Sequence, residues 1–243
     1  MNTILILGAN SDIAKATAHE YANNGFNIQL ACRNKSRLER FAKDLAIRSN
    51  QSVELFELDI LDLSQHSVFF DSLKSMPNGV ISAIGYLGEQ QESHRNSDEF
   101  VRVTNTNYTA IANLLNIVAQ NFSEIGSGFI VGISSVAGDR GRSSNYIYGA
   151  SKAAFSAYLS GMRQSLFDKG VQVLTVKPGF VDTTMTKDID LPEKITASPE
   201  RVAKDIYNAQ IKGRSVVYTM SLWFIIMSIV KSIPEFIFKR LKM

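Results

Sequence analysis

Short apolar runs alternate with longer amphipathic stretches along the whole chain. Seven of the apolar runs are predicted to be strands: residues 3–7, 27–32, 53–58, 79–83, 127–133, 171–176 and 215–218. Their apolar residues are nearly continuous, which is typical of a sheet covered by helices on both faces. The stretches between them include four predicted helices: residues 13–24, 36–48, 106–122 and 148–169.

This strand–helix alternation predicts an α/β fold. Right-handed crossovers between parallel strands would build a doubly wound sheet of the Rossmann type, with seven strands and helices on both faces. No repeat or linker divides residues 1–220, so we expect one dinucleotide-binding and catalytic domain followed by a tail, residues 221–243. Residues 179–199 have no clear period and are predicted to form a mobile loop that covers substrate.

Composition narrows the classes of function. The net charge is only +3 at pH 7, which argues against a nucleic-acid-binding surface spread over the fold. Cys32 is the only cysteine, so no intramolecular disulfide can form and a reducing, cytoplasmic compartment fits. His19, His66 and His94 lack the spacing of metal ligands, and no metal site is expected. Residues 3–7 are too short for the apolar core of a secretion signal.

The turn between the first predicted strand and helix is a candidate phosphate site. A helix that begins there would point its free amides and its positive dipole end at a pyrophosphate. The turn residues expected to contact the cofactor are Gly8, Asn10, Ser11, Asp12 and Ile13. Only one of the usual glycines is present, so an ordinary strand–helix turn is the alternative. Asp12 either lies beside the phosphate or caps the helix with its carboxylate turned away.

The ends of the next two predicted strands indicate which dinucleotide would bind. An acidic residue at the second strand's end would bond the ribose 2′-hydroxyl, but Cys32 stands there and Arg33 follows. An arginine suits a 2′-phosphate, so NADP is favoured over NAD; the alternative is that Arg33 is a solvated surface charge. At the end of the third strand, Asp59 and Ile60 are placed to contact the adenine.

A phenol and an ammonium lie four residues apart at Tyr148 and Lys152, on one face of a predicted helix. A nearby ammonium favours phenolate and so lowers the pKa of a tyrosine, which makes Tyr148 a candidate proton donor to a carbonyl that is reduced by hydride. Ser135, thirteen positions upstream at the end of a predicted strand, can donate to the same oxygen.

With the Asn107-Tyr108-Thr109-Ala110 segment, Asp59 and the Pro178-Gly179 turn, this arrangement resembles the short-chain dehydrogenase/reductase family over nearly the whole chain. The resemblance implies that Tyr148 is the acid/base and that Lys152 holds the nicotinamide ribose and lowers the tyrosine pKa. It implies that Ser135 orients the carbonyl and that Asn107 supports a proton-relay water. Further cofactor contacts that it implies are Ala83, Gly85, Pro178, Gly179 and Val181. The family's Asn-Asn-Ala-Gly after the fourth strand is here Ser82-Ala83-Ile84-Gly85.

Three other stretches, residues 84–89, 137–145 and 232–241, are similar to the reductase half of the decaprenylphosphoryl-ribose epimerase system. That type of enzyme reduces a keto-sugar carried on a polyprenyl phosphate and made by a separate flavin oxidase. This narrower resemblance implies a lipid-linked keto-sugar as substrate and a flavin oxidase as partner. The rival hypothesis is a reductase of a soluble ketone, alcohol or acyl-carrier substrate. A nucleotide-sensing regulatory protein is a third, which the intact Ser135, Tyr148 and Lys152 weigh against.

The tail carries a strongly apolar run, residues 222–230, which is interrupted too early to span a bilayer as a helix. After it come Lys231, a second apolar run at residues 236–238, and a basic end of Lys239, Arg240 and Lys242. This pattern predicts either an in-plane anchor at an anionic membrane surface or a segment packed on the core or in a dimer interface. A homodimer or homotetramer is expected; if the tail is an anchor, it would make peripheral contact with the inner face of the membrane.

Overall fold

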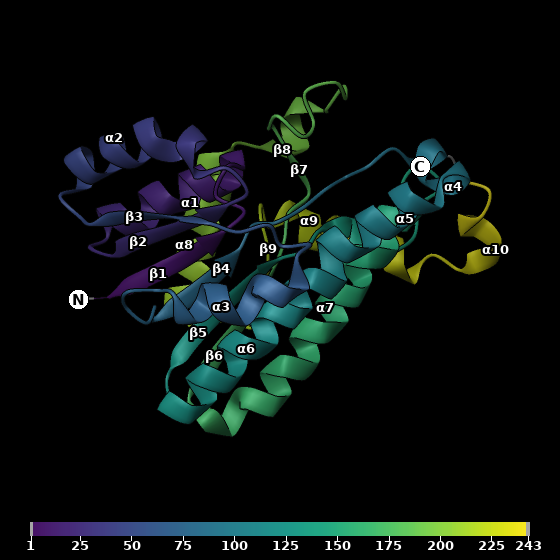
Figure 1. Cartoon of the computed structure of the whole chain (residues 1–243). Coiled ribbons are helices and arrows are strands. Elements are labelled where there is room, and N and C mark those ends of the chain that lie inside the picture. The colour runs from purple at the N-terminus through teal and green to yellow at the C-terminus, as the bar shows by residue number, and fades with distance from the viewer. Residues whose placement is uncertain (1, 242–243) are drawn as a thin grey trace.

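The computed structural model describes residues 2–241, which form a seven-stranded parallel sheet with helices on both faces (Figure 1). The strands lie in the order β3-β2-β1-β4-β5-β6-β9. Their bounds are β1 Thr3–Leu7, β2 Asn27–Cys32, β3 Val53–Glu57, β4 Gly79–Ser82, β5 Gly128–Ile133, β6 Val171–Lys177 and β9 Val216–Tyr218. The predicted doubly wound α/β fold is confirmed, and each predicted strand is found within one residue of its expected bounds.

Alternate residues of each strand face two separate apolar layers. In β1, Ile4 and Ile6 contribute to one core and Leu5 and Leu7 to the other. Burial on both faces is the reason that the strands are continuously apolar in sequence.

One core is covered by α1 (Asp12–Asn23), α2 (Glu39–Ser49) and α8 (Pro199–Ile211). The other is covered by α3 (His66–Asp71), α6 (Ala110–Ile125) and α7 (Tyr146–Leu166), and Figure 1 shows α6 and α7 side by side.

The segment between β4 and α6 contains helices that the sequence pattern did not predict. They are α4 (Gln90–Arg95), α5 (Ser97–Thr104) and a short π-helical stretch, Asn105–Thr109. The predicted helix at 106–122 is therefore divided: its first residues belong to the π-helical stretch, and α6 continues to Ile125. The expected loop at 179–199 contains a short two-stranded pairing of β7 (Phe180–Val181) with β8 (Thr196–Ala197).

The tail folds into α9 (Leu222–Ser232) and α10 (Glu235–Phe238). Trp223, Met227 and Val230 are buried against Val136, so one face of α9 packs on the domain. No helix within residues 2–241 is long and apolar enough to cross a membrane. Lys242, part of the predicted basic end, lies outside the described residues.

The sheet topology determines where a ligand would bind. β1 pairs in parallel with β2 on one side and with β4 on the other, so the strand order reverses at β1. In open α/β sheets, ligands bind at such a switch point, outside the carboxyl ends of the strands. The loops after β1, β2, β3 and β4, and those after β5 and β6 further along this edge, are therefore the region to search for a site.

Candidate active site

A cavity of about 200 Å³ opens at the carboxyl edge of the sheet. Eight of the residues predicted to bind the cofactor line it: Gly8, Asn10, Ser11, Arg33, Asp59, Ile60, Ala83 and Gly85. They come from the loops after β1, β2, β3 and β4, which are far apart in sequence. The topology thus brings together most of the residues that the sequence assigned to a dinucleotide.

The turn after β1 requires a glycine. Gly8 has a φ of +76°, and a Cβ placed there would lie 2.9 Å from the Ile84 side chain and 3.0 Å from the Ala83 backbone. The absence of a side chain lets the loop after β4 approach the turn closely. Ser11 then begins α1 as its N-cap, because its hydroxyl accepts a hydrogen bond from the Ala14 amide at 3.2 Å. The tight turn at Gly8 and the cap at Ser11 thus place the N-terminus of α1 beside the cavity.

Asp12 does not cap α1, contrary to one of the two roles predicted for it. Ser11 already serves as the cap, and Asp12 is the first residue of the helix. The Asp12 carboxylate instead accepts a hydrogen bond from the backbone amide of Thr184, at 2.7 Å. Thr184 lies in the loop after β7, so Asp12 connects the candidate phosphate turn to the predicted substrate loop. Ile13 packs against the core and does not line the cavity.

Arg33 and Asp59 lie at the end of the cavity formed by β2 and β3. Arg33 is exposed and has no ion-pair partner among residues 2–241, so its charge is available to an anion. Cys32 before it is buried. One oxygen of Asp59 accepts from the Leu61 amide at 3.0 Å, which fixes the carboxylate at the cavity wall. The contact of Arg33 with a 2′-phosphate stays a prediction.

The candidate catalytic residues lie on the turn after β5 and on the first turns of α7. Two glycines let these segments touch: a Cβ on Gly138 would come within 2.7 Å of the backbone at Lys152 and Ala153, and one on Gly149 within 2.8 Å of the Ala137 carbonyl oxygen. Ser135 is oriented by the Ala137 amide, which donates to its hydroxyl oxygen at 3.1 Å.

Tyr148 is held next to Ser135, and burial raises its pKa to about 12, while a hydrogen bond with the Ser135 side chain acts in the opposite direction. The lowering of this pKa by Lys152 stays a prediction. Desolvation is the larger of the two effects, because burial disfavours the charged phenolate.

Lys152 is only 2 % exposed. Its ammonium donates to the carbonyl oxygen of Ile133 at 3.1 Å and of Ile84 at 3.4 Å, and it lies 5.8 Å from the centroid of the Tyr148 ring. Burial lowers the pKa of Lys152 to about 8. The ammonium is thus the dominant form at neutral pH and is lost as pH rises through this value.

Asn107 is fully buried in the π-helical stretch. Its amide donates to the carbonyl oxygens of Val103 at 2.8 Å and Tyr86 at 2.7 Å and accepts from the Tyr86 amide at 3.0 Å. The side chain therefore fixes the loop after β4. A Cβ on Gly85 of that loop would lie 3.7 Å from both Asn107 Oδ1 and Lys152 Nζ, so these groups converge at the inner end of the cavity. The role of Asn107 in a proton relay stays a prediction.

The turn after β6 borders the catalytic group but does not line the cavity. The Pro178 carbonyl oxygen accepts from the Val136 amide at 2.9 Å, which ties this turn to the one that carries Ser135. Gly179 lies against the Trp223 ring with no room for a Cβ, and Val181 is buried in the core. The cofactor contacts predicted for Pro178, Gly179 and Val181 stay predictions.

Several lining residues were not predicted as site residues, and Arg102 and Thr106 are the two of them that come from the segment before α6. The Arg102 guanidinium lies 4.4 Å from the centroid of the Tyr86 ring and 3.8 Å from a Glu99 oxygen. Arg102 is four positions before Thr106, which is adjacent to Asn107. If the helix had been predicted to begin before Arg102 instead of at residue 106, Arg102 and Thr106 would have been placed on the same side of it.

Comparisons with known proteins agree with this geometry. The profile described as short chain dehydrogenase matches residues 2–194. An uncharacterized oxidoreductase of Mycobacterium tuberculosis is 32 % identical over 241 residues, which cover 98 % of this chain and 96 % of the relative. An uncharacterized oxidoreductase of Streptomyces coelicolor is 31 % identical over 242 residues, covering 98 % and 95 %.

Solved structures give the same result for the fold. A short-chain dehydrogenase from Sphingobium yanoikuyae in complex with NADPH superimposes with a TM-score of 0.84 at 25 % identity, covering 97 % of each chain. A short-chain dehydrogenase from Burkholderia cenocepacia in complex with NADP also has a TM-score of 0.84, at 19 % identity and with 100 % and 98 % coverage. With its fold, its cavity and the sequence match over residues 2–194, the chain belongs to the short-chain dehydrogenase family of oxidoreductases.

Proposed function

We propose that the protein is an NADPH-dependent reductase that converts a carbonyl group to a secondary alcohol. The observation that carries the proposal is the grouping of Ser135, Tyr148 and Lys152. The Lys152 ammonium of this group lies near Gly85, which lines the cavity. NADPH, when bound, supplies the hydride. The NADPH and NADP complexes of the two structural neighbours support the choice of cofactor.

The protonation state of Tyr148 suits proton donation. With a pKa of about 12, Tyr148 keeps its proton at neutral pH and can donate it to the carbonyl oxygen as hydride reaches the carbon. The Ser135 hydroxyl is placed to donate to the same oxygen and so to stabilise its developing negative charge. Proton donation leaves a tyrosinate, and the Lys152 ammonium nearby would stabilise it.

For the substrate, we propose a keto-sugar carried on a polyprenyl phosphate, with a separate flavin oxidase that supplies it. Support comes from the similarity of residues 84–89, 137–145 and 232–241 to that type of reductase, and from exposed apolar side chains on α9 and α10. The rival is a soluble ketone or acyl-carrier substrate, and a test with long-chain and short-chain forms of one keto-sugar separates the two. We further propose a cytoplasmic homodimer or homotetramer, and a division of roles between residues 1–220 and the tail.

The bond from the Thr184 amide to Asp12 suggests how the substrate loop is held. A carboxylate acceptor makes this a charge-assisted hydrogen bond, which is about twice as strong as a neutral one. It connects the loop between β7 and β8 to the turn at which the cofactor phosphates would lie. We propose that Asp12 holds this loop over the bound reactants.

Replacing Tyr148→Phe keeps the ring and removes the proton, so turnover should fall by roughly a hundredfold or more. The measurement is the loss of NADPH absorbance with a panel of ketones and keto-sugars, beside NADPH affinity and thermal unfolding, which should change little. A Tyr148→Phe protein that turns over at the rate of the unaltered enzyme would contradict the mechanism.

Arg33→Ala should weaken NADPH binding by about 1–3 kcal/mol, the range of a charge-assisted hydrogen bond, and leave NADH binding nearly unchanged. Fluorescence titration with both cofactors measures the difference. Arg40→Ala is the matched control, because Arg40 is exposed on α2 and does not line the cavity. Equal losses for NADPH and NADH would show that Arg33 does not recognise the 2′-phosphate.

Asp12→Ala should release the substrate loop. Trypsin should then cleave faster after Lys187 and Lys194, which are exposed in this loop, and KM should rise roughly tenfold with a smaller change in kcat. NADPH affinity should not fall, since the change removes a negative charge beside the phosphate turn. Asp12→Asn retains an acceptor oxygen and should give an intermediate result. Unchanged cleavage in Asp12→Ala would mean that the bond does not hold the loop.

A further inference from the structure

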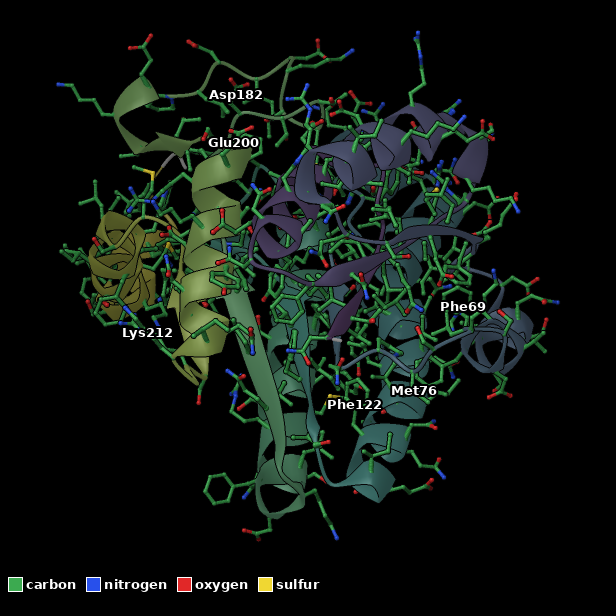
Figure 2. All side chains as sticks on the ribbon, turned by 90° about the vertical axis from the view of Figure 1, so that its left-hand side faces the viewer. Phe69, Met76, Phe122, Asp182, Glu200 and Lys212 are labelled. Carbon is green, nitrogen blue, oxygen red and sulfur yellow. The ribbon has the colours of Figure 1, made fainter. Side chains whose placement is uncertain are left out.

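The C-terminal helices expose several large apolar side chains. We call this set the C-terminal apolar surface: Phe224, Ile225, Ile229, Phe236, Ile237 and Leu241, each 43–63 % exposed. Figure 2 shows the yellow C-terminal segment at the left edge of the molecule, with its side chains projecting outward. A concentration of this kind within one short segment is a recognised mark of an interaction site.

Packing on the domain does not account for these residues. Trp223, Met227 and Val230 lie on one side of α9 and already bury it against the turn after β5. Ile225 and Ile229 lie on the opposite side of the helix. The outer face of a surface helix is ordinarily polar, so an apolar outer face indicates a second environment beyond the domain.

The charges around the surface have one sign. Glu235 is the only acidic residue between positions 219 and 241, and its carboxylate is paired with Arg140 at 2.7 Å. Lys231, Lys239 and Arg240 are exposed and have no ion-pair partner among the described residues. The matching partner is therefore apolar at its centre and negatively charged where it meets these cations.

We propose that the C-terminal apolar surface docks on a lipid bilayer that contains anionic headgroups. Helices lying in the plane of such a bilayer bury apolar side chains at the acyl boundary while their basic residues meet the headgroups. A second copy of the chain fits less well. In a two-fold contact the same patch faces itself, which would bring two sets of the three cations together without acidic partners.

The docked helix is joined to the active-site loop. Trp223 on α9 donates its indole N–H to the Ile195 carbonyl oxygen at 3.0 Å, and its ring meets Phe180 edge-on with a centroid distance of 5.2 Å. Phe180 and Ile195 stand at the two ends of the substrate loop. Docking would thus hold this loop at the bilayer, where a lipid-linked substrate is presented; only this last step rests on the proposed function.

Vesicle flotation of the full chain tests the docking. We expect the protein to float with vesicles of phosphatidylcholine and phosphatidylglycerol and to stay mostly below vesicles of phosphatidylcholine alone. High salt should weaken binding, since it screens the contribution of the cations. Failure of the unaltered chain to float with the anionic vesicles overturns the proposal.

The double variant Ile225→Ser/Ile229→Ser should reduce the floated fraction at least tenfold. Its matched control is Ile47→Ser/Phe167→Ser, which replaces two side chains that are 83 % and 79 % exposed outside the surface. Lys231→Gln/Lys239→Gln should also reduce flotation on anionic vesicles. Thermal unfolding confirms that each variant folds, and an equal loss in the control pair would overturn the proposal.

Two further readouts separate this proposal from the others. Sedimentation velocity shows whether the double variant Ile225→Ser/Ile229→Ser dissociates an oligomer. If the variant dissociates and the unaltered chain does not bind vesicles, the surface binds a second copy of the chain instead. Reduction of a small soluble ketone should proceed equally with and without vesicles. If the unaltered protein reduces no such ketone, the reductase assignment is refuted, but the result of the vesicle-binding experiment is unaffected.

Discussion

The close contact between the turn after β5 and the start of α7 is the constraint on which the site depends. Ser135 is on the turn, whereas Tyr148 and Lys152 are on the helix, so their mutual placement is set by how near the two segments come. Gly138 and Gly149 allow backbone to meet backbone there. The Ser134 hydroxyl donates to the Lys152 carbonyl oxygen at 2.9 Å, and the Lys152 ammonium donates to the Ile133 carbonyl oxygen at 3.1 Å.

Around this contact, other segments are fixed by side-chain hydrogen bonds rather than by apolar packing alone. The Asn107 side-chain amide forms hydrogen bonds with the backbone of the loop after β4, and that loop forms part of the cavity wall. Asp12 and Trp223 bond to opposite parts of the substrate loop. The candidate phosphate turn and the tail are therefore both linked to the substrate loop, each by one side-chain hydrogen bond that can be removed separately.

The fold was predictable because it depends on local pattern. A strand buried on both faces has to be apolar throughout, which located all seven strands of the main sheet to within one residue. Helix α5 was missed because it has only eight residues and Val103 is its only buried one, so its apolar pattern is too short to stand out in the sequence. Arg102 was missed for the same reason, because its position in the cavity depends on that helix.

Only those features of the site that follow from residue type and sequence spacing could be predicted. The Tyr148–Lys152 spacing defined one helical face, but the raised pKa of Tyr148 follows from burial, which no short motif reveals. The partner of Asp12 is 172 positions away in sequence. The tail's apolar run likewise allowed two interpretations, since it is apolar all round; the structure shows one of its faces packed on the domain and the other exposed.

A crystal structure of the protein with NADPH tests the central claim most directly. The account predicts the 2′-phosphate against Arg33, the pyrophosphate at the start of α1, and the nicotinamide beside Tyr148 and Lys152. A nicotinamide bound away from Tyr148, or a cofactor in the reverse orientation with its adenosine at the catalytic residues, would contradict it.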